Sequence, residues 1–278
     1  MMHDPSSILV VTPTLGESAH LEQTVRRVAS LSNPIAHVLS APAGQVPSLQ
    51  DRFPMTQVVA DYGKPGGLYG ALNAALEAVP SGWGWFTYIN DDDFLLPGFG
   101  DMAQQHMRRP GHEEVAYGDV EVIREDGRVM SRVTTERNPA WIPALLHQGI
   151  SPLMQQGMLI QRETMDRLGR FDTRYRLCAD LDLWLRAYAA GHRFRHYSIP
   201  VARFRLRSGQ LSSNTELTIR EQDEIVGRHL PNKTAPVIGL LARLRYRVCN
   251  LPRYAERVRT SGFRRSYQIL ASAGAPRK

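Results

Sequence analysis

The chain is poor in cysteine and lacks any long apolar run. Its 278 residues include two cysteines, Cys178 and Cys249, which lie far apart and form no CxxC pair. They provide neither a disulfide framework nor a zinc cluster, which is typical of a reducing compartment. The apolar stretch from Ile8 to Val11 is too short for a signal peptide. No segment approaches the roughly 20 apolar residues of a membrane-spanning helix. The sequence therefore predicts a cytoplasmic protein, at most peripheral on the inner face of the cell membrane.

Acidic residues are scarce at one end of the chain. The net charge is +7, but residues 233–278 hold eleven Lys/Arg and one acid, Glu256, which gives +10 there. The first 232 residues therefore carry 7 − 10 = −3. This asymmetry predicts a mildly acidic domain over residues 1–232 and a basic, helical extension over residues 233–278. The high overall pI belongs to the extension, so it does not indicate a nucleic-acid partner for the domain.

Short apolar runs predict strands in the first ninety residues. Four runs are rich in β-branched or aromatic side chains and too short for helices: 8–11, 36–39, 57–60 and 85–89. Helical spacing follows the first and third runs, at Leu21, Val25, Val28 and Leu31 and at Leu68, Leu72, Ala75 and Val79. We expect Ser18 to cap the first helix and a loop to join the second run to the third. The alternation predicts an α/β fold with a mostly parallel sheet flanked by helices.

The second half of the chain contains three local patterns. Residues 115–123 and 125–129 predict a β-hairpin closed by Asp126-Gly127. Residues 163–168 predict a short helix ended by Gly169. Residues 179–190 predict a longer helix that Gly191 ends, with an inward face formed by Leu181, Leu185 and Tyr188.

Three adjacent carboxylates, Asp91, Asp92 and Asp93, follow the run at 85–89 after Asn90. Such a cluster is costly unless water or a cation neutralises it. A solvated acidic turn is one interpretation, and a divalent cation that bridges the carboxylates to a diphosphate is the other. Because ligands of parallel sheets bind beyond the carboxyl ends of the strands, the position favours the cation.

The segment FTYINDDDFLLPG resembles the aspartate motif of the family 2 glycosyltransferases. This resemblance implies a GT-A fold, a nucleotide-facing Asn90 and an Mn²⁺ or Mg²⁺ ion at Asp92 with Asp93 beside it. An Asp91/Asp93 metal pair is the alternative, and Asp91 otherwise belongs to the donor side.

Two further segments are similar to the bacterial polysaccharide-assembly branch of that family. ILVVTPTLGES matches its first strand, and DYGKPGGLYGALNAALEA matches a later motif. They add seven donor-binding candidates: Pro13, Thr14, Glu17, Asp61, Gly67, Tyr69 and Asn73. The family's base-contacting aspartate is absent from SAPAGQ at residues 40–45, Gly70 replaces an aspartate and Gln155-Gln156 replaces a His-Gln pair. The donor, a UDP-, dTDP- or GDP-sugar, therefore stays open.

The resemblance also matches Asp180 to the catalytic base, with Ala179 in place of the motif's glutamate. A structural interpretation of this helix start pairs Asp182 with Arg186 one turn later. Because Asp180 and Asp182 are two residues apart, only one of them can share the inward face. On the acceptor side we expect Gln155, Gln156, Asp182 and Trp184.

The sequence thus predicts an inverting, metal-dependent glycosyltransferase that moves a sugar from a nucleotide-sugar donor to a sugar or lipid-linked acceptor in polysaccharide or glycolipid assembly. A metal-dependent nucleotidyltransferase is one alternative, although TPTLGES offers no basic residue for a phosphate loop. A basic nucleic-acid- or membrane-binding module without catalysis is another. In the extension, Val237, Leu241, Leu244 and Val248 recur at heptad spacing among arginines. This pattern predicts either a helix packed on the domain with a solvated basic side or a segment on an anionic membrane.

Overall fold

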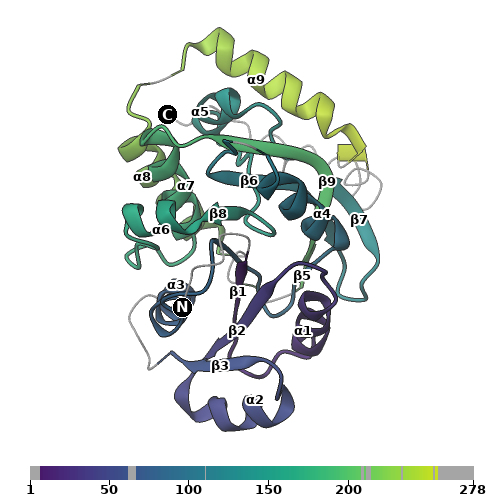
Figure 1. The fold of residues 1–278 in the computed structure, drawn as a ribbon. Helices are drawn as coiled ribbons and strands as arrows, with labels where there is room; N and C mark the ends of the chain where they lie inside the picture. The colour runs from purple at the N-terminus through teal and green to yellow at the C-terminus, as the bar shows by residue number, and fades with distance from the viewer. Residues whose placement is uncertain are drawn as a thin grey trace.

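A computed structural model describes residues 7–61, 67–109, 111–207, 210, 214–232, 234–252 and 254–255. These residues form a single sheet of nine strands in the order β3-β2-β1-β4-β8-β6-β9-β5, with β7 paired to β6. Helices lie on both faces of the sheet (Figure 1). The predicted α/β class with a mostly parallel, helix-flanked sheet is confirmed.

The first half of the sheet is parallel. β1 (Ile8–Pro13) lies between β2 (Ile35–Ala41) and β4 (Trp85–Tyr88), and β3 (Gln57–Ala60) lies at the edge beside β2. All four predicted strands are confirmed, because short runs of β-branched and aromatic residues fill a sheet that is buried on both faces.

The two predicted helices of this half are α1 (Leu21–Ala29) and α3 (Gly67–Ala78). The prediction that Ser18 caps α1 is wrong, because the N-cap is His20 and it makes no side-chain cap. The Ser18 hydroxyl instead donates a hydrogen bond to the Asp91 carbonyl oxygen at 3.0 Å. This contact joins the loop after β1 to the aspartate motif.

The loop predicted between β2 and β3 is also wrong. This segment forms η1 (Ala43–Gln45) and α2 (Val46–Arg52). Pro47 lies in the first turn of α2, where a proline needs no backbone partner. Leu49 of α2 packs with Leu21 and Leu39 in a small apolar cluster, so α2 covers the outer end of the sheet.

The second half of the sheet is mixed. β6 (Val115–Ile123) and β7 (Val129–Val133) form the predicted hairpin, in which Gly127 has φ 84°. β8 (Leu159–Gln161) pairs antiparallel with both β4 and β6. β9 (Phe194–Arg205) runs parallel to β6, and β5 (Phe94–Leu95) pairs antiparallel with β9.

The helices of this half are, in chain order, α4 (Pro97–Met107), η2 (Pro139–Trp141), α5 (Ile142–His147), α6 (Arg162–Leu168), α7 (Ala179–Ala189) and α8 (Thr215–His229). The predicted helices α6 and α7 are confirmed. Each is followed by the expected glycine with positive φ, Gly169 at 78° and Gly191 at 81°. Glycine adopts this conformation at helix ends without a steric penalty.

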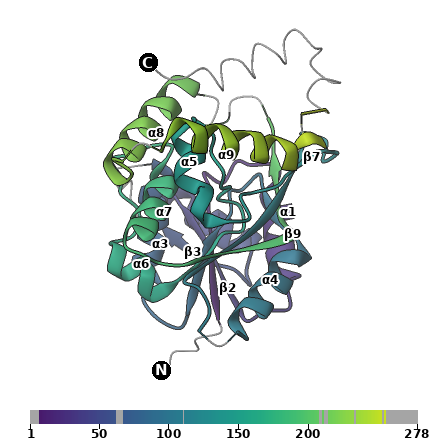
Figure 2. The same cartoon turned by 90° about the horizontal axis from the view of Figure 1, so that it is seen from above.

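Two apolar clusters lie on the two faces of the sheet. On one face, Leu9, Val11, Phe86 and Tyr88 belong to the larger cluster, which includes residues of α3, α6 and α7. On the other face, Ile8, Val10 and Trp85 pack with residues of α1 and α4. Alternate residues of one strand point to opposite faces, and in β1 both sets are apolar. The layers are seen from above in Figure 2.

The final described helix, α9 (Pro236–Cys249), packs on α5. Ala242 and Tyr246 form a buried cluster there with Ala144 and Leu145. Residues 256–278 of the predicted extension lie outside the described residues. Within the described part of the chain, no helix is long and apolar enough to cross a membrane.

Candidate active site

The carboxyl ends of β1 and β4 lie side by side because these strands are parallel neighbours. Thr14, one residue beyond β1, donates a hydrogen bond from its hydroxyl to Asp91 Oδ2 at 2.5 Å. Burial raises the pKa of Asp91, and the Thr14 hydroxyl partly offsets that effect. Thr24 of α1 donates to the Asp93 carbonyl oxygen at 2.6 Å. The loop after β1 and helix α1 therefore hold the aspartate motif together, through the Asp91 side chain and the carbonyl oxygens of Asp91 and Asp93.

Asp93 is fully buried and its carboxylate has three hydrogen-bond donors. Oδ1 accepts from the Arg205 backbone N–H at 2.8 Å, and Oδ2 accepts from Gln156 at 3.1 Å and Asn90 at 3.2 Å. Burial, followed by the neighbouring charge of Asp92, raises the pKa of Asp93 to about 7. This carboxylate ties β4, β9 and the loop before β8 together. It exposes no oxygen to an ion.

Asp92 has a different environment. Arg207 donates from Nε to Asp92 Oδ2 at 2.5 Å, while the buried Arg205 donates from its Nε to the Asp92 carbonyl oxygen at 3.0 Å. The hydrogen bond with Asp92 raises the pKa of Arg207. Sequence reasoning missed both arginines. The available signal was the pair of basic residues in FRLR, directly at the end of the strand that covers the motif.

Within the described residues, no group of three or more His, Cys, Asp or Glu side chains could hold a metal ion. A cation at this motif would therefore depend on few protein ligands. Asp92 fits such a role, because its carboxylate is contacted by one side chain, that of the partly exposed Arg207, which binds Oδ2. Divalent cations that act with phosphates are often held by one or two carboxylates, and the substrate and water supply the remaining ligands.

Asp180 lies in the first turn of α7 and is partly exposed. The Tyr88 hydroxyl donates to Asp180 Oδ2 at 3.4 Å, and the Leu181 backbone N–H donates to Oδ1 at 2.8 Å. Burial raises the pKa of Asp180 to about 6, although these donors and Tyr69 act in the opposite direction. A carboxylate with a pKa near neutrality is suited to accept a proton.

The chain that leads into α7 is held from two sides. Glu221 of α8 accepts hydrogen bonds from three consecutive backbone N–H groups, those of Arg176, Leu177 and Cys178, at 2.8, 2.9 and 3.0 Å. Sequence reasoning missed Glu221, because nothing local links it to a segment more than 40 residues earlier. Its contacts fix the start of α7 and therefore the position of Asp180.

Two of the donor-binding candidates contact the same segment. The Tyr69 hydroxyl donates to the Leu177 carbonyl oxygen at 3.0 Å. The Asn73 amide exchanges two hydrogen bonds with the backbone of Phe171, at 2.9 and 3.3 Å. These contacts make Tyr69 and Asn73 supports of the chain before α7, and their contact with a donor stays a prediction.

The other predicted residues take varied positions. Pro13 ends β1, Glu17 is exposed in the following loop, Asp61 follows β3 and Gly67 begins α3. Gly66 lies outside the described residues. Asp182 is buried, and its two oxygens accept from Arg186 at 2.7 Å and His229 at 2.8 Å. The predicted Asp182–Arg186 pair is therefore present, and it faces α8.

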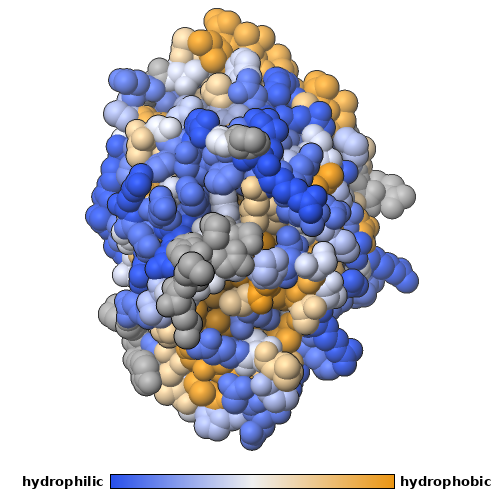
Figure 3. Space-filling model, viewed as in Figure 1, coloured by the Kyte–Doolittle hydropathy of each residue, from blue (hydrophilic) through white to orange (hydrophobic). Residues whose placement is uncertain are grey.

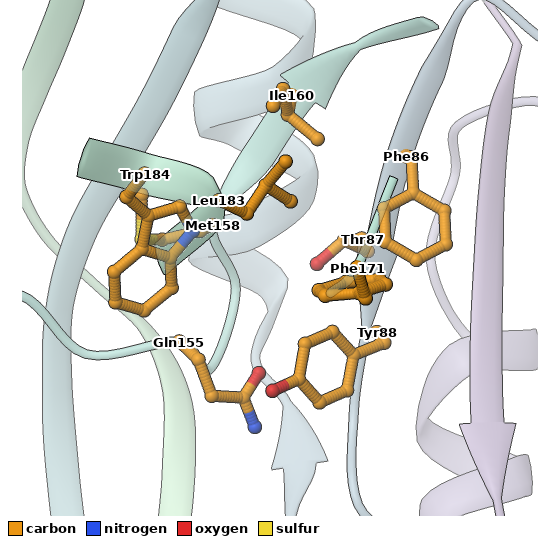
Figure 4. Close-up of a pocket in the computed structure, with 9 residues that line it drawn as sticks. All are labelled: Phe86, Thr87, Tyr88, Gln155, Met158, Ile160, Phe171, Leu183 and Trp184. Atoms are coloured by element: carbon orange, nitrogen blue, oxygen red, sulfur yellow. The ribbon is translucent and has the colours of Figure 1, made fainter. Parts of the chain in front are cut away.

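A small cavity lies beside Tyr88 (Figure 4). Gln155 lines it, and its amide points toward the Tyr88 hydroxyl in that view. Both polar atoms of this amide are buried and have no hydrogen-bond partner among the described residues. Trp184, another acceptor-side candidate, forms part of the wall. Buried polar groups are normally hydrogen-bonded, and the cavity of about 20 Å³ has room for about one water molecule beside this amide.

The sheet and its flanking helices have the GT-A type of α/β fold, which solved structures share. S. aureus TarS 1–349 in complex with UDP-GlcNAc matches with a TM-score of 0.56 and 14% identity, over 81% of this chain and 71% of that chain. The mannosyltransferase PcManGT from Pyrobaculum calidifontis, in complex with GDP-Man and Mn²⁺, matches with a TM-score of 0.57 and 16% identity, over 99% and 82%. No protein-family profile and no curated protein matches the chain. The GT-A fold predicted from the motifs is confirmed.

Proposed function

We propose that the chain is a metal-dependent, inverting glycosyltransferase that moves a sugar from a nucleotide-sugar donor to an acceptor hydroxyl. The observation that carries this proposal is the Asp180 carboxylate, whose pKa of about 6 and contact with Tyr88 suit a general base. It lies in a GT-A fold shared with proteins solved in complex with UDP-GlcNAc and with GDP-Man and Mn²⁺.

In the proposed reaction, the acceptor hydroxyl attacks the anomeric carbon of the donor. Asp180 takes the hydroxyl proton as the new carbon–oxygen bond forms. The bond between the anomeric carbon and the diphosphate breaks, and its electron pair leaves with the nucleoside diphosphate. A single displacement of this kind inverts the anomeric configuration. A positioned base typically contributes about 10²–10⁴-fold to such a rate.

The departing diphosphate requires positive charge beside it. We assign the metal, Mn²⁺ or Mg²⁺, to Asp92. Both carboxylates are buried, but that of Asp93 is occupied by three donors, whereas one partly exposed arginine contacts that of Asp92. Bound there, the ion would neutralise charge on the diphosphate. Besides the metal ion, the partly exposed side chain of Arg207 provides positive charge at this position. We expect Arg207 to exchange its contact with Asp92 for a contact with the diphosphate.

The finer assignments are part of the proposal. We expect a UDP-, dTDP- or GDP-sugar as donor, a sugar or lipid-linked sugar as acceptor, and a role in polysaccharide or glycolipid assembly. We also propose that the reaction takes place in the cytoplasm, at the inner membrane face, and that residues 1–232 form the catalytic domain with 233–278 as its extension. The unpartnered Gln155 amide and Trp184 support an acceptor site beside Asp180.

A thermal-shift panel of nucleotide sugars, each measured with manganese and with EDTA, tests the proposal. One nucleotide class should raise the unfolding temperature only when manganese is present. The donor found in this way should then be consumed when candidate acceptors are added, with release of the nucleoside diphosphate. If no nucleotide sugar changes the unfolding temperature under either condition, the proposed function is wrong.

A further inference from the structure

The outward face of α9 is apolar. Seven large aliphatic side chains of α9 and of Leu251 just after it are exposed, from 47% at Ile238 to 69% at Val237. Six of them share one face, and we refer to these six as the α9 stripe: Val237, Leu240, Leu241, Leu244, Val248 and Leu251. By helical spacing Ile238 lies outside the stripe, next to Arg245. At 3.6 residues per turn, the stripe covers about 100° of the helix circumference. In Figure 3, apolar side chains gather at the top of the molecule, where Figure 1 has α9.

The inward face of α9 fixes this orientation. It consists of small or polar residues and one tyrosine, all buried: Gly239, Ala242, Tyr246 and Asn250. A Cβ atom at Gly239 would lie 2.5 Å from Gln148 Nε2. The Asn250 side chain accepts from the Thr134 backbone N–H at 2.9 Å and donates to the Thr134 carbonyl oxygen at 3.0 Å. A rotation that buries the α9 stripe would break these contacts.

The sequence left two possibilities open for this segment, a helix packed on the domain with a solvated basic side and a segment on an anionic membrane. The helix packs on the domain, and it does so through the face opposite the heptad residues Val237, Leu241, Leu244 and Val248. Large aliphatic side chains concentrated on the solvent side of a monomer mark an interaction surface.

The charge around the stripe indicates what it contacts. α9 contains no acidic residue. Arg243 and Arg247 lie on one flank of the stripe by helical spacing. Arg245 lies on the other flank, where it forms an ion pair with the buried Glu136 of the domain. Residues 250–278 add seven Lys/Arg and one acid, Glu256. An apolar stripe with basic flanks is typical of helices that lie in the headgroup region of an anionic bilayer.

We propose that α9 docks the protein on an anionic lipid bilayer, with the α9 stripe inserted among the acyl chains and with Arg243 and Arg247 at the phosphates. A second copy of the chain is a poorer partner. Two copies joined by their stripes would bring two extensions of +10 together without an acidic residue on α9 to pair with them. A nucleic acid is also a poorer partner, because the stripe has no aromatic side chain on which bases stack.

The α9 stripe is separate from the candidate active site, and its test does not depend on sugar transfer. The full chain is sedimented with vesicles of phosphatidylcholine alone and of phosphatidylcholine mixed with phosphatidylglycerol. We expect binding to the anionic vesicles, and weaker binding as salt rises, since screening limits the reach of the charges to about 8 Å at physiological salt.

The decisive variant is Leu241→Gln/Leu244→Gln/Val248→Gln, which changes only exposed side chains. Its partitioning onto anionic vesicles should fall about tenfold or more, because the apolar contact with the acyl chains is lost. A matched control, Met55→Gln/Ile219→Gln, removes exposed aliphatic side chains elsewhere and should bind as the parent does. Unfolding temperatures of all three proteins show whether the fold is kept.

Any of three results would overturn the proposal. The first is that the parent protein fails to sediment with anionic vesicles at low salt, and the second is that the triple variant binds them as well as the parent does. The third is that the parent is a dimer in solution and the triple variant a monomer, which would identify the stripe as a contact between copies. A variant that unfolds is replaced by Leu241→Ala/Leu244→Ala, which keeps helix propensity and is judged by the same measurements.

Discussion

The Tyr88 hydroxyl at the end of β4 donates a hydrogen bond to Asp180 at the start of α7, across 3.4 Å. The two residues are 92 positions apart in the chain. β4 also leads directly into the aspartate motif, so Tyr88 links the candidate base to the candidate metal position. This link has a consequence for the pH dependence of the proposed reaction.

The Tyr88→Phe variant should shift the acid limb of the rate profile to higher pH. In the parent, kcat/KM should fall about tenfold per pH unit below the Asp180 pKa of about 6, as the base becomes protonated. The Tyr88 hydroxyl stabilises the charged carboxylate and lowers this pKa. Its removal therefore raises the pKa and moves the midpoint upward. A profile of kcat/KM against pH for both proteins measures the shift, and an unchanged midpoint contradicts the role of the contact.

Asp180→Asn should abolish transfer and stabilise the protein at neutral pH. The expected loss in kcat is a hundredfold or more, while donor affinity in calorimetry stays as in the parent. The folded-state pKa of Asp180 is raised from 3.8, so the folded protein holds the proton more tightly than the unfolded chain does. Its stability therefore falls as pH rises through the interval from about 4 to about 6. Asparagine carries no charge and removes the cost of burying a carboxylate, so the unfolding temperature of the variant should exceed that of the parent above pH 6.

Asp182→Asn is the matched control and should behave in the opposite way. Asp182 is buried between Arg186 and His229, and removing one partner of a buried charged pair costs about 3 kcal/mol in the free energy of unfolding. Transfer by the folded fraction should fall much less than in Asp180→Asn. Chemical denaturation and transfer assays on both variants make the comparison. Equal catalytic losses, or a loss confined to position 182, would show that Asp180 is not the base.

The two buried aspartates of the motif should respond differently to alanine. Asp92→Ala should remove the dependence of nucleotide binding on manganese and leave the fold intact. Asp93→Ala leaves the donors from Arg205, Gln156 and Asn90 without an acceptor. It should therefore lower the unfolding temperature. Calorimetry of nucleotide binding in manganese and in EDTA measures the first effect, and equal affinity of the parent under both conditions would disprove a metal at Asp92.

Local patterns in the sequence were enough for most of the first half of the fold, whereas β5, β8 and β9 and the helices α4, α5 and α8 were not predicted. The strands and helices of the first half follow from short apolar runs and from helical spacing, because each run must fill one layer of a two-faced core. α2 was missed since Pro47 marks a break in most contexts, whereas it begins a helix here. The direction in which α9 faces could not be predicted. Which side of the helix packs depends on how closely Gly239 and Ala242 approach α5, and the spacing of its large residues does not show this.

The candidate site was predictable where residues follow strand ends. Thr14 and Asp91 meet because β1 and β4 are parallel neighbours. The alternation of strands and helices indicates that the strands are parallel, and the order of the strands comes from the structure. The contacts of Arg207 with Asp92 and of Glu221 with the chain before α7 were not predictable. They join segments 115 and about 45 positions apart, and no local periodicity marks them. Only the three-dimensional structure brings these residues to the site.

Gln155→Leu should weaken acceptor use without changing donor binding. The Gln155 amide is buried in the cavity beside Tyr88, and neither of its polar atoms has a partner among the described residues. If an acceptor hydroxyl supplies that partner, leucine removes the hydrogen bond while keeping similar bulk. The acceptor KM should then rise about fivefold or more, since a hydrogen bond of this kind contributes about 1 kcal/mol or more.

The same substitution separates this role from a purely structural one. An amide that no ligand contacts is costly to bury, so leucine at that position would leave transfer unchanged and raise the unfolding temperature. An acceptor contact predicts that the same gain in stability accompanies a higher KM. Gln156→Leu is the control: Gln156 donates to Asp93, so its loss should lower stability instead. Two measurements decide between the acceptor contact and the purely structural role: steady-state kinetics with the acceptor varied at saturating donor, and unfolding temperatures. An unchanged acceptor KM would show that Gln155 is not part of the acceptor site.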